Sequence, residues 1–340
     1  MCSGLASMDR YIRQESLIGP DAQAAIRRSR VAVIGAGGLG SPALLYLAAA
    51  GVGSIVLIDD DTVAVSNLHR QVIHATDNVG QLKVDSAVSR MGALNPDTAV
   101  ETISERLSWD NALDVLAGCD VVVDGSDNFH TRHIASHAAA RLGIPHVWGS
   151  ILGFEAQMSV FWADKGPVYE DLFPAPPPPG SVPSCAQAGV LGPVVGVVGS
   201  TMAMEVLKIV TGLGQPLVGT LAYYDSLVGT WEYVPVVADP AVTDTIRTQV
   251  PPRGPAEVDQ IEPGALVLDV RTIDEFAEYH LPGSVHVPLA EILAGTTPEI
   301  ENGAVVVCAS GVRSAQAVQA LTSRGVPGLA SLRGGLNRLR

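Results

Sequence analysis

The chain has 340 residues, of which 47% are hydrophobic and 16% are charged, and its formal net charge at pH 7 is −14. This composition excludes a mostly disordered chain, and the length predicts about two domains. An acidic chain is poorly suited to DNA, RNA or an anionic membrane, so we expect neither nucleic acid nor membrane as a partner.

The four cysteines, Cys2, Cys119, Cys185 and Cys308, are too scattered for a disulfide framework, and no two of them form a CxxC pair. Together with an N-terminal segment that lacks an apolar signal sequence, this pattern predicts a cytoplasmic protein with one or two reactive thiols. Residues 188–204 are uncharged but contain Pro193. They predict a buried helix or a subunit interface rather than a membrane span.

Strand and helix patterns alternate through the N-terminal half. Residues 9–23 predict a polar helix or arm, and a buried strand over 30–35 runs into the glycine-rich turn 35–40. The elements expected next are helix 41–51, strand 54–61, helix 81–94, strand 100–104, helix 110–116, a buried strand from 119, helix 130–142 and strand 144–150. This alternation predicts a doubly wound, mostly parallel α/β sheet of the Rossmann-like type. Residues 154–164 would extend the sheet by an antiparallel strand.

Two proline-rich stretches divide the chain. Residues 173–185 predict a mobile loop that leads to Cys185, and residues 236–255 predict a linker. We therefore expect an N-terminal domain over 1–235 and a smaller α/β domain over 256–340. The elements expected in the smaller domain are strand 266–271, helix 273–280, strand 284–288, strand 304–311 and helix 312–323.

The glycine turn has the GxGxxG pattern, with Gly35, Gly37 and Gly40 as its three glycines. Glycines there let the backbone approach a phosphate, and the helix that follows presents free N–H groups to the anion. Asp59, at the end of the next strand, is placed to accept from ribose hydroxyls. The pattern alone fits NAD, FAD, S-adenosylmethionine or ATP.

Charged residues near this turn narrow the choice of ligand. Asn67 and Arg70 share one short turn, Lys83 follows, and DGSDN ends a strand with Asp127 and Asn128. Two cations and a strand-end carboxylate suit a triphosphate with a divalent metal better than a dinucleotide. Each residue alone also fits a plainer role, such as a surface ion pair or a helix cap.

These motifs carry a resemblance to the MoeB/ThiF family, the ubiquitin-activating-like enzymes that adenylate sulfur-carrier proteins. RYIRQ, GAGGLG, LIDDDTVAVSNLHRQ, VGQLKVDSA, the NP at 95–96, DGSDN and CAQAGVLGPVVGVVGS follow in the family's order over about residues 8–233. The resemblance implies ATP contacts from the turn glycines and from Gly38, Asp59, Ser66, Asn67, Arg70, Lys83, Asp127 and Asn128. It also implies that Asp127 binds magnesium, and that Arg13 reaches the nucleotide of a partner subunit in a homodimer. The carboxylate of a carrier's C-terminal Gly-Gly would attack ATP and give an acyl-adenylate and pyrophosphate.

The chain departs from that family at its zinc site. Members often hold zinc with two CxxC pairs, but Val168 and Asp171 stand where the first pair belongs, and no cysteine stands at the second. We therefore expect no zinc, and we expect packing around the proline-rich stretch to take its place. We assign no metal to the histidines.

A second reactive segment is CASGVRS, Cys308 to Ser314, which follows a buried strand and opens a helix. Backbone N–H groups, the helix dipole and Arg313 would lower the pKa of the thiol and stabilise a persulfide. These local features are also compatible with an ordinary buried core cysteine at position 308. With LDVRTIDEFAEYHLPGSVHVP upstream, the segment resembles a rhodanese domain, with Cys308, Gly311 and Arg313 in the persulfide loop. Scaffold positions match at Asp269, Arg271, Glu275, His280, Pro282 and Gly283, whereas Tyr279 and His286 depart from the pattern.

An adenylating domain joined to a rhodanese domain is the architecture of MoeZ-like sulfurtransferases. The resemblance implies that a cysteine desulfurase or thiosulfate loads Cys308, whose persulfide then attacks the acyl-adenylate. Cys185 would release the carrier thiocarboxylate. Three alternatives stay open: protein conjugation through a Cys185 thioester, a non-catalytic nucleotide-binding scaffold, and an NAD dehydrogenase.

Overall fold

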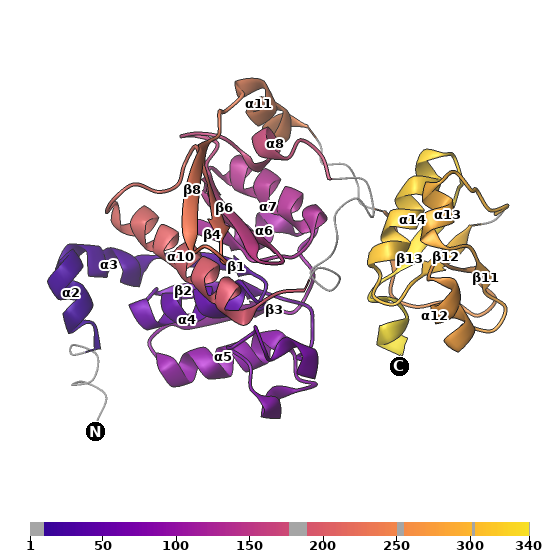
Figure 1. Ribbon diagram of the computed structural model, residues 1–340, viewed down its shortest axis with the longest axis horizontal. Coiled ribbons are helices and arrows are strands. Elements are labelled where there is room, and N and C mark those ends of the chain that lie inside the picture. Colours follow the sequence, from indigo (N-terminus) through magenta and orange to yellow (C-terminus); the bar gives the residue numbers. More distant parts are fainter. Residues whose placement is uncertain (1–9, 177–188, 250–254, 301–302, 340) are drawn as a thin grey trace. The chain divides into compact units, whose positions relative to one another are not determined.

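The computed structural model describes residues 10–176, 189–249, 255–300 and 303–339. The chain divides into two compact units, Met1–Pro251 and Pro252–Arg340, which we call unit 1 and unit 2 (Figure 1). Each unit has its own sheet and its own buried core.

The described part of unit 1 contains an eight-stranded sheet in the order β3-β2-β1-β4-β5-β6-β7-β8. Its strands are β1 Arg30–Ile34, β2 Ser54–Ile58, β3 Ala99–Ile103, β4 Val121–Asp124, β5 His146–Leu152, β6 Glu155–Phe161, β7 Thr220–Asp225 and β8 Thr230–Pro235. Strands β3, β2, β1, β4 and β5 pair in parallel, and β6 to β8 continue the sheet in antiparallel pairs. The predicted mostly parallel α/β sheet is therefore confirmed, and β7 and β8 add to it a hairpin that the sequence did not predict.

Helices cover both faces of this sheet. They are α2 Ile12–Ile18, α3 Pro20–Arg28, α4 Gly40–Ala50, α5 Lys83–Leu94, α6 Ala112–Leu116, α7 Phe129–Leu142, α8 Tyr169–Leu172, α10 Gly192–Thr211 and α11 Pro240–Thr248. Val31 and Val33 of β1 pack in the same core as α4, α5 and α10, whereas Ala32 and Ile34 pack on the other face with α6 and α7. Both faces of the strand are buried, which explains its unbroken apolar sequence.

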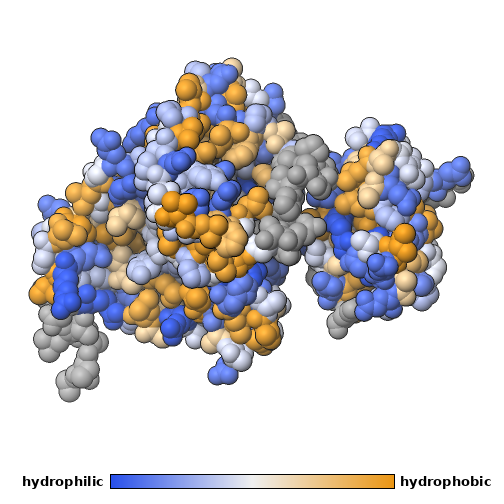
Figure 2. All heavy atoms as spheres, viewed as in Figure 1, coloured by the Kyte–Doolittle hydropathy of each residue, from blue (hydrophilic) through white to orange (hydrophobic). Residues whose placement is uncertain are grey.

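Helix α10 takes up most of the uncharged segment noted above. By length and composition it is apolar enough to cross a membrane, but 44% of its apolar window is buried inside unit 1. A side chain at Gly199 would lie 2.4 Å from the Leu39 carbonyl oxygen, so glycine permits close packing beside α4. Apolar side chains also reach the surface, where Figure 2 shows them in patches between polar ones.

The predicted linker contains a helix. Residues 236–255 were expected to join the domains, but α11 lies within them and packs against α7. The Arg141 guanidinium donates to the Ile246 carbonyl at 3.0 Å, and Ile246 is buried. Pro240 stands at the first turn of α11, where the Asp239 side chain caps the helix, so this proline starts a helix instead of preventing one.

The described part of unit 2 has a five-stranded parallel sheet in the order β11-β10-β12-β13-β9. Its elements are β9 Glu257–Val258, β10 Val267–Asp269, α12 Ile273–Glu278, β11 Val285–His286, α13 Leu289–Leu293, β12 Ala304–Val307, α14 Val312–Ser323, β13 Leu329–Leu332 and the 3-10 helix η3 Gly335–Leu339. The predicted second, smaller α/β domain is confirmed.

Candidate functional site

The glycine turn joins the end of β1 to the start of α4. A side chain at Gly40 would lie 1.8 Å from the Gly35 carbonyl oxygen, so only glycine fits where α4 begins. Gly35 has a φ of +91°, in the left-handed region that favours glycine. At Gly37 a side chain would meet only the Gln71 amide nitrogen, at 3.7 Å. The turn is therefore tightly packed at its two ends and open at Gly37.

The turn lies at the topological switch point of the sheet. Strands β2 and β3 are added on one side of β1, and β4 and β5 on the other. Strands β2 and β4 both flank β1, with Ile34 in register with Ile58 and with Asp124. The carboxyl ends of β1, β2 and β4 therefore meet at one edge. In open α/β sheets this edge is where ligands bind.

Asp59 follows β2 at that edge, and its carboxylate holds the turn. One oxygen accepts from the Ala36 N–H at 2.8 Å and the other from the Asp61 N–H at 2.9 Å. Burial raises the pKa of Asp59, although the Lys83 charge and the two N–H donors oppose the shift. The sequence predicted Asp59 as a ribose contact, and the structure adds this contact with the glycine turn.

Lys83 opens α5 and is only 6% exposed. Its ammonium lies 2.9 Å from the Asp61 carboxylate, which is itself 64% exposed. Burial lowers the pKa of Lys83, but the charges of Asp59, Asp61 and Asp127 outweigh that effect and raise it. The lysine therefore stays charged and shares one electrostatic environment with these three carboxylates.

Ser66, Asn67 and Arg70 lie on a short turn that includes the 3-10 helix Val65–Asn67. The Asn67 side-chain oxygen accepts from the Ala64 N–H at 3.0 Å, and Arg70 donates to the Ser66 carbonyl at 2.9 Å. A side chain at Gly192 would lie 2.5 Å from the His69 carbonyl oxygen. The turn is therefore packed against the start of α10, and the Arg70 guanidinium stays partly exposed.

Asp127 and Asn128 follow β4. Asn128 is the N-cap of α7, because its side-chain oxygen accepts from the Thr131 N–H at 2.9 Å, while Asp127 is exposed. Behind them, the buried Asp124 carboxylate lies 3.1 Å from the His146 ring. Burial raises the pKa of Asp124, but hydrogen bonds from His146 and Ser126 outweigh it, so the net shift is downward.

Arg13 lies exposed on α2, which contacts the other end of α4. A side chain at Gly51 would lie 2.6 Å from the Tyr11 ring, and the Gln14 amide donates to the Ala50 carbonyl at 3.0 Å. The glycine turn is at the N-terminal end of α4, and α2 is at its C-terminal end. An 11-residue helix is about 16 Å long, so Arg13 lies away from the glycine turn of its own chain.

The residues at the family's zinc position do not fit zinc. Val168 is a buried hydrocarbon, and Asp171 uses both carboxylate oxygens to accept from the Val168 and Asp239 N–H groups, at 2.8 and 2.9 Å. Among the described residues, no group of three or more His, Cys, Asp or Glu side chains is placed to hold a metal ion. One carboxylate thus ties α8 to the start of α11, in the region where the family uses zinc.

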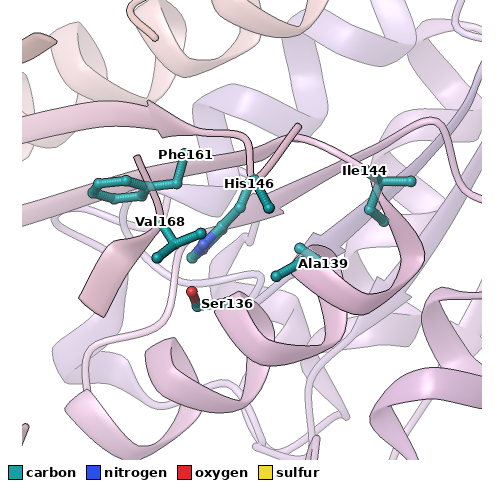
Figure 3. A pocket seen from close by; sticks show the side chains of 8 residues that line it. Ser136, Ala139, Ile144, His146, Phe161 and Val168 are labelled. Carbon is teal, nitrogen blue, oxygen red and sulfur yellow. The ribbon is translucent and has the colours of Figure 1, made fainter. Parts of the chain in front are cut away.

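A buried polar cluster lies beside α8. The Glu170 carboxylate accepts from the Ser136 hydroxyl at 2.7 Å and pairs with the His133 ring at 2.8 Å. His133 and His137 are four residues apart on α7, so the sequence does contain an HxxxH spacing, contrary to the expectation that no histidines have it. Close by, His146 and Ser136 line a cavity of about 10 Å³ (Figure 3), which holds a water molecule at most.

Two further residues near the glycine turn were also missed. His74 contacts Ala36, and Gln71 lies beside Gly37 with its side-chain oxygen buried and without a hydrogen-bond partner. Gln71 and His74 stand one and four residues after Arg70, and this closeness in sequence is the signal that pointed to them.

In unit 2, Cys308 follows β12 and is 0% exposed. Its sulfur accepts from the Gly311 N–H at 3.1 Å and lies 3.5 Å from the Ser314 hydroxyl. Gly311 has a φ of +88° and is the N-cap residue of α14. The loop from Cys308 to Arg313 thus turns its own backbone toward the sulfur.

Arg313 does not present a free charge to this loop. Its guanidinium forms two hydrogen bonds to the Glu275 carboxylate, at 2.6 and 2.7 Å. These bonds lower the pKa of Glu275 to about 2, and they are the main reason that the pKa of Arg313 is raised. Cys308 contributes to the Arg313 shift, so the cation is paired with Glu275 and still close to the sulfur.

The scaffold positions of unit 2 also pair with one another. Arg271 binds the buried Asp269 carboxylate at 2.6 Å, and the Phe276 ring stacks between His280 and His286, each at 4.2 Å. His286, one of the departures noted above, also bonds the Arg271 carbonyl at 2.9 Å. Cys2 and Cys185 lie outside the described residues.

Comparison with known proteins agrees with these observations. Residues 9–243 match the ThiF family and residues 256–340 match the rhodanese-like domain. The chain is 40% identical over 350 residues to the probable adenylyltransferase/sulfurtransferase MoeZ of Mycobacterium tuberculosis, covering 94% of this chain and 88% of the relative. It is 49% identical over 240 residues to the sulfur carrier protein adenylyltransferase of Thermus thermophilus, covering 68% of this chain and 89% of the relative.

Among solved structures, E. coli MccB with ATP is similar in fold, with a TM-score of 0.60 and 21% identity over 68% of this chain and 73% of that one. The chain therefore belongs to the ThiF family, and with its rhodanese-like domain it has the domain composition of an adenylyltransferase and sulfurtransferase.

Proposed function

We propose that the chain uses ATP to adenylate the C-terminal Gly-Gly carboxylate of a ubiquitin-like sulfur-carrier protein, and then replaces the adenylate with sulfur from Cys308. The observation that carries the first step is the meeting of the glycine turn, a buried charged lysine and strand-end carboxylates at the topological switch point of one sheet. The carrier is inferred from the names of the relatives.

The residues at this edge fit a nucleotide triphosphate. The open backbone at Gly37 and the start of α4 suit phosphate oxygens, and Asp59 suits the ribose. Lys83 and Arg70 would face the polyphosphate. Asp127, an exposed carboxylate, has the hard oxygen ligands that Mg²⁺ prefers. Magnesium bound with the nucleotide would neutralise part of the phosphate charge.

In the adenylation step, a carrier carboxylate oxygen forms a bond to the α-phosphorus, and the bond to the pyrophosphate breaks. Negative charge builds on the phosphoryl oxygens and on the leaving group. Arg70 and Lys83 stabilise that charge; Arg70 is held by its bond to the Ser66 carbonyl, and the Lys83 side chain is buried at the start of α5.

We propose a homodimer in which Arg13 serves the partner's nucleotide. Its place at the C-terminal end of α4 keeps it from the glycine turn of its own chain, and Ile12 and Leu17 beside it are exposed apolar residues. A second protomer would cover these side chains and bring the guanidinium to its nucleotide.

In the transfer step, the outer sulfur of a Cys308 persulfide attacks the acyl carbon, and AMP leaves. A thiolate, which we assign to Cys185, then attacks the Cys308 sulfur and releases the carrier thiocarboxylate, leaving a disulfide that a cellular dithiol reduces. A cysteine desulfurase or thiosulfate supplies the sulfur. These thiols require the reducing cytoplasm.

Pyrophosphate exchange with ATP, magnesium and carrier tests the adenylation site. Arg70→Ala and Asp127→Ala should each reduce exchange by about 100-fold or more, because each removes a group that stabilises the transition state. Arg90→Ala, an exposed arginine on α5, is the matched control and should exchange normally. Normal exchange in both site variants would contradict the assignment.

A further inference from the structure

We propose that His74 is a positioning residue for the nucleotide. It donates a hydrogen bond to the Ala36 carbonyl and thereby orients the Gly37 N–H toward a bound phosphate. This inference rests on the proposed binding of ATP at the glycine turn. His74 would touch neither the nucleotide nor the carrier.

His74 is 7% exposed and uses both ring nitrogens. Nε2 lies 2.9 Å from the Ala36 carbonyl oxygen, and Nδ1 lies 2.8 Å from the Ser86 hydroxyl. A carbonyl oxygen only accepts, so Nε2 carries the hydrogen and Nδ1 accepts from Ser86. Of the two neutral tautomers, the Ala36 carbonyl thus selects the one with hydrogen on Nε2.

The Ala36 carbonyl and the Gly37 N–H belong to one trans peptide unit, so they point in opposite directions. Fixing the carbonyl toward His74 therefore fixes the N–H toward the other side. The backbone at Gly37 is also accessible, because a side chain there would meet only the Gln71 amide nitrogen, at 3.7 Å. Within the described residues, the Gly37 N–H has no hydrogen-bond acceptor.

The preceding peptide is fixed as well. The Ala36 N–H donates to Asp59 at 2.8 Å, so Ala36 is held at both of its polar groups. Rigid N–H donors stabilise an anion more than mobile ones, because no reorganisation is needed when the ligand binds.

His74 also connects the turn to the lysine helix. Its partner Ser86 lies on α5, one turn after Lys83. Burial lowers the pKa of His74, the hydrogen bond to Ala36 opposes that shift, and the Lys83 charge lowers it further. Burial and the Lys83 charge therefore favour the neutral ring, in which Nε2 carries the hydrogen.

The test measures ATP affinity by calorimetry and the KM values for ATP and carrier in pyrophosphate exchange. His74→Phe keeps a ring but removes the donor, and should weaken ATP binding by about tenfold, with the carrier KM unchanged. His74→Gln restores an N–H donor and should recover most of the affinity. Ser86→Ala frees the ring and should weaken ATP binding by about threefold.

His133→Phe is the matched control, since His133 is also 7% exposed and lies in the Glu170 cluster. It should lower the midpoint of thermal unfolding without changing ATP affinity. The proposal is overturned if folded His74→Phe binds ATP normally, if His74→Gln gives no recovery, or if His133→Phe weakens ATP binding equally. Should His74→Phe fail to fold, unchanged ATP affinity in Ser86→Ala would overturn it. If the wild-type protein binds ATP but gives no pyrophosphate exchange, the proposed adenylation is refuted. The role of His74 can still be judged in that case from the ATP affinities alone.

Discussion

The two units both place a glycine-containing turn between a strand and a helix, but they hold that turn in different ways. In unit 1, side chains hold it: Asp59 binds the Ala36 N–H and His74 binds the Ala36 carbonyl. In unit 2, the N–H groups of Leu336 and Asn337 donate to the Cys308 and Ala309 carbonyls, and the Ser314 and Ser331 hydroxyls donate to the Gly311 carbonyl. Two titratable side chains from outside the turn can tune a site for a ligand that comes and goes. A loop held by neutral backbone and hydroxyl groups suits sulfur bound covalently to its own cysteine.

The cations of the two sites also differ in how firmly each is paired with a carboxylate. Lys83 makes one contact with Asp61, whose carboxylate is 64% exposed and can turn away when a polyanion arrives. Arg313 makes two hydrogen bonds to Glu275 in a planar fork. We infer that the unit 1 cation exchanges partners during the reaction and that the unit 2 cation stays paired.

The sharpest separation of the two units comes from Cys308→Ser. This variant should abolish carrier thiocarboxylate and leave pyrophosphate exchange at the wild-type rate, because the hydroxyl fits the buried site but forms no persulfide. Mass spectrometry of the carrier and the exchange assay are run on the same preparation. Thiocarboxylate formed by Cys308→Ser would show that the sulfur comes from elsewhere.

The exchange of partners by Lys83 is tested next. If Lys83 contacts the phosphates as we propose, Lys83→Met should reduce pyrophosphate exchange by about 100-fold, because it removes a cation that stabilises the transition state. Asp61→Asn removes only an exposed partner and should change exchange by about threefold or less. Equal losses in the two variants would mean that the Lys83–Asp61 pair acts as one fixed unit.

Removal of the Asp171 carboxylate, at the position where the family uses zinc, tests the stability of unit 1 away from the glycine turn. Asp171→Ala should lower the free energy of unfolding of unit 1 by about 1–2 kcal/mol, because it leaves two N–H groups without their acceptor. All four tryptophans lie in unit 1, so tryptophan fluorescence in urea reports on it. A chelator should leave the wild-type curve unchanged, and a chelator-induced shift would indicate a stabilising metal.

The smallest effect is expected for Glu275→Gln in unit 2. The Arg313 guanidinium lowers the pKa of Glu275 to about 2. The Glu275–Arg313 pair therefore stabilises the folded state fully above about pH 4.5, and this stabilisation is lost as the pH falls toward 2. Both side chains are about one third exposed, so solvent screening limits the contribution to about 1 kcal/mol at pH 7.

This pH dependence is followed by pulse-labelled amide exchange in urea on peptides from residues 256–340. The difference in free energy of unfolding of unit 2 between wild-type protein and Glu275→Gln should be smaller at pH 3.5 than at pH 7. A difference that widens at pH 3.5 would contradict the sign of the shift.

The sequence predicted the elements that have strong periodicity or punctuation. The apolar run of β1, the glycines of the turn and Gly51 at the end of α4 are local signals, and the fold follows them. Helix α11 was missed because the prolines around it indicate a linker, and its docking on α7 depends on contacts far apart in sequence.

The candidate site shows the same division. Motif spacing picked out Arg70, Lys83 and Asp127, although binding by these residues stays a prediction. It did not reveal that Asn128 caps α7, or that Arg313 is paired with Glu275, because both facts depend on partners that only folding brings together. A lone histidine in an apolar segment, such as His74, resembles an ordinary core residue until its hydrogen bonds are seen.

The central claim is that this chain converts a carrier carboxylate to a thiocarboxylate through an adenylate. Its most direct test is the mass of a Gly-Gly-terminated sulfur carrier after incubation with the full-length protein, ATP, magnesium and a persulfide donor. We predict that the carrier gains the mass of one oxygen replaced by sulfur at its C-terminus, and only when ATP is present. A carrier of unchanged mass, or one attached to protein lysines instead, would contradict the account.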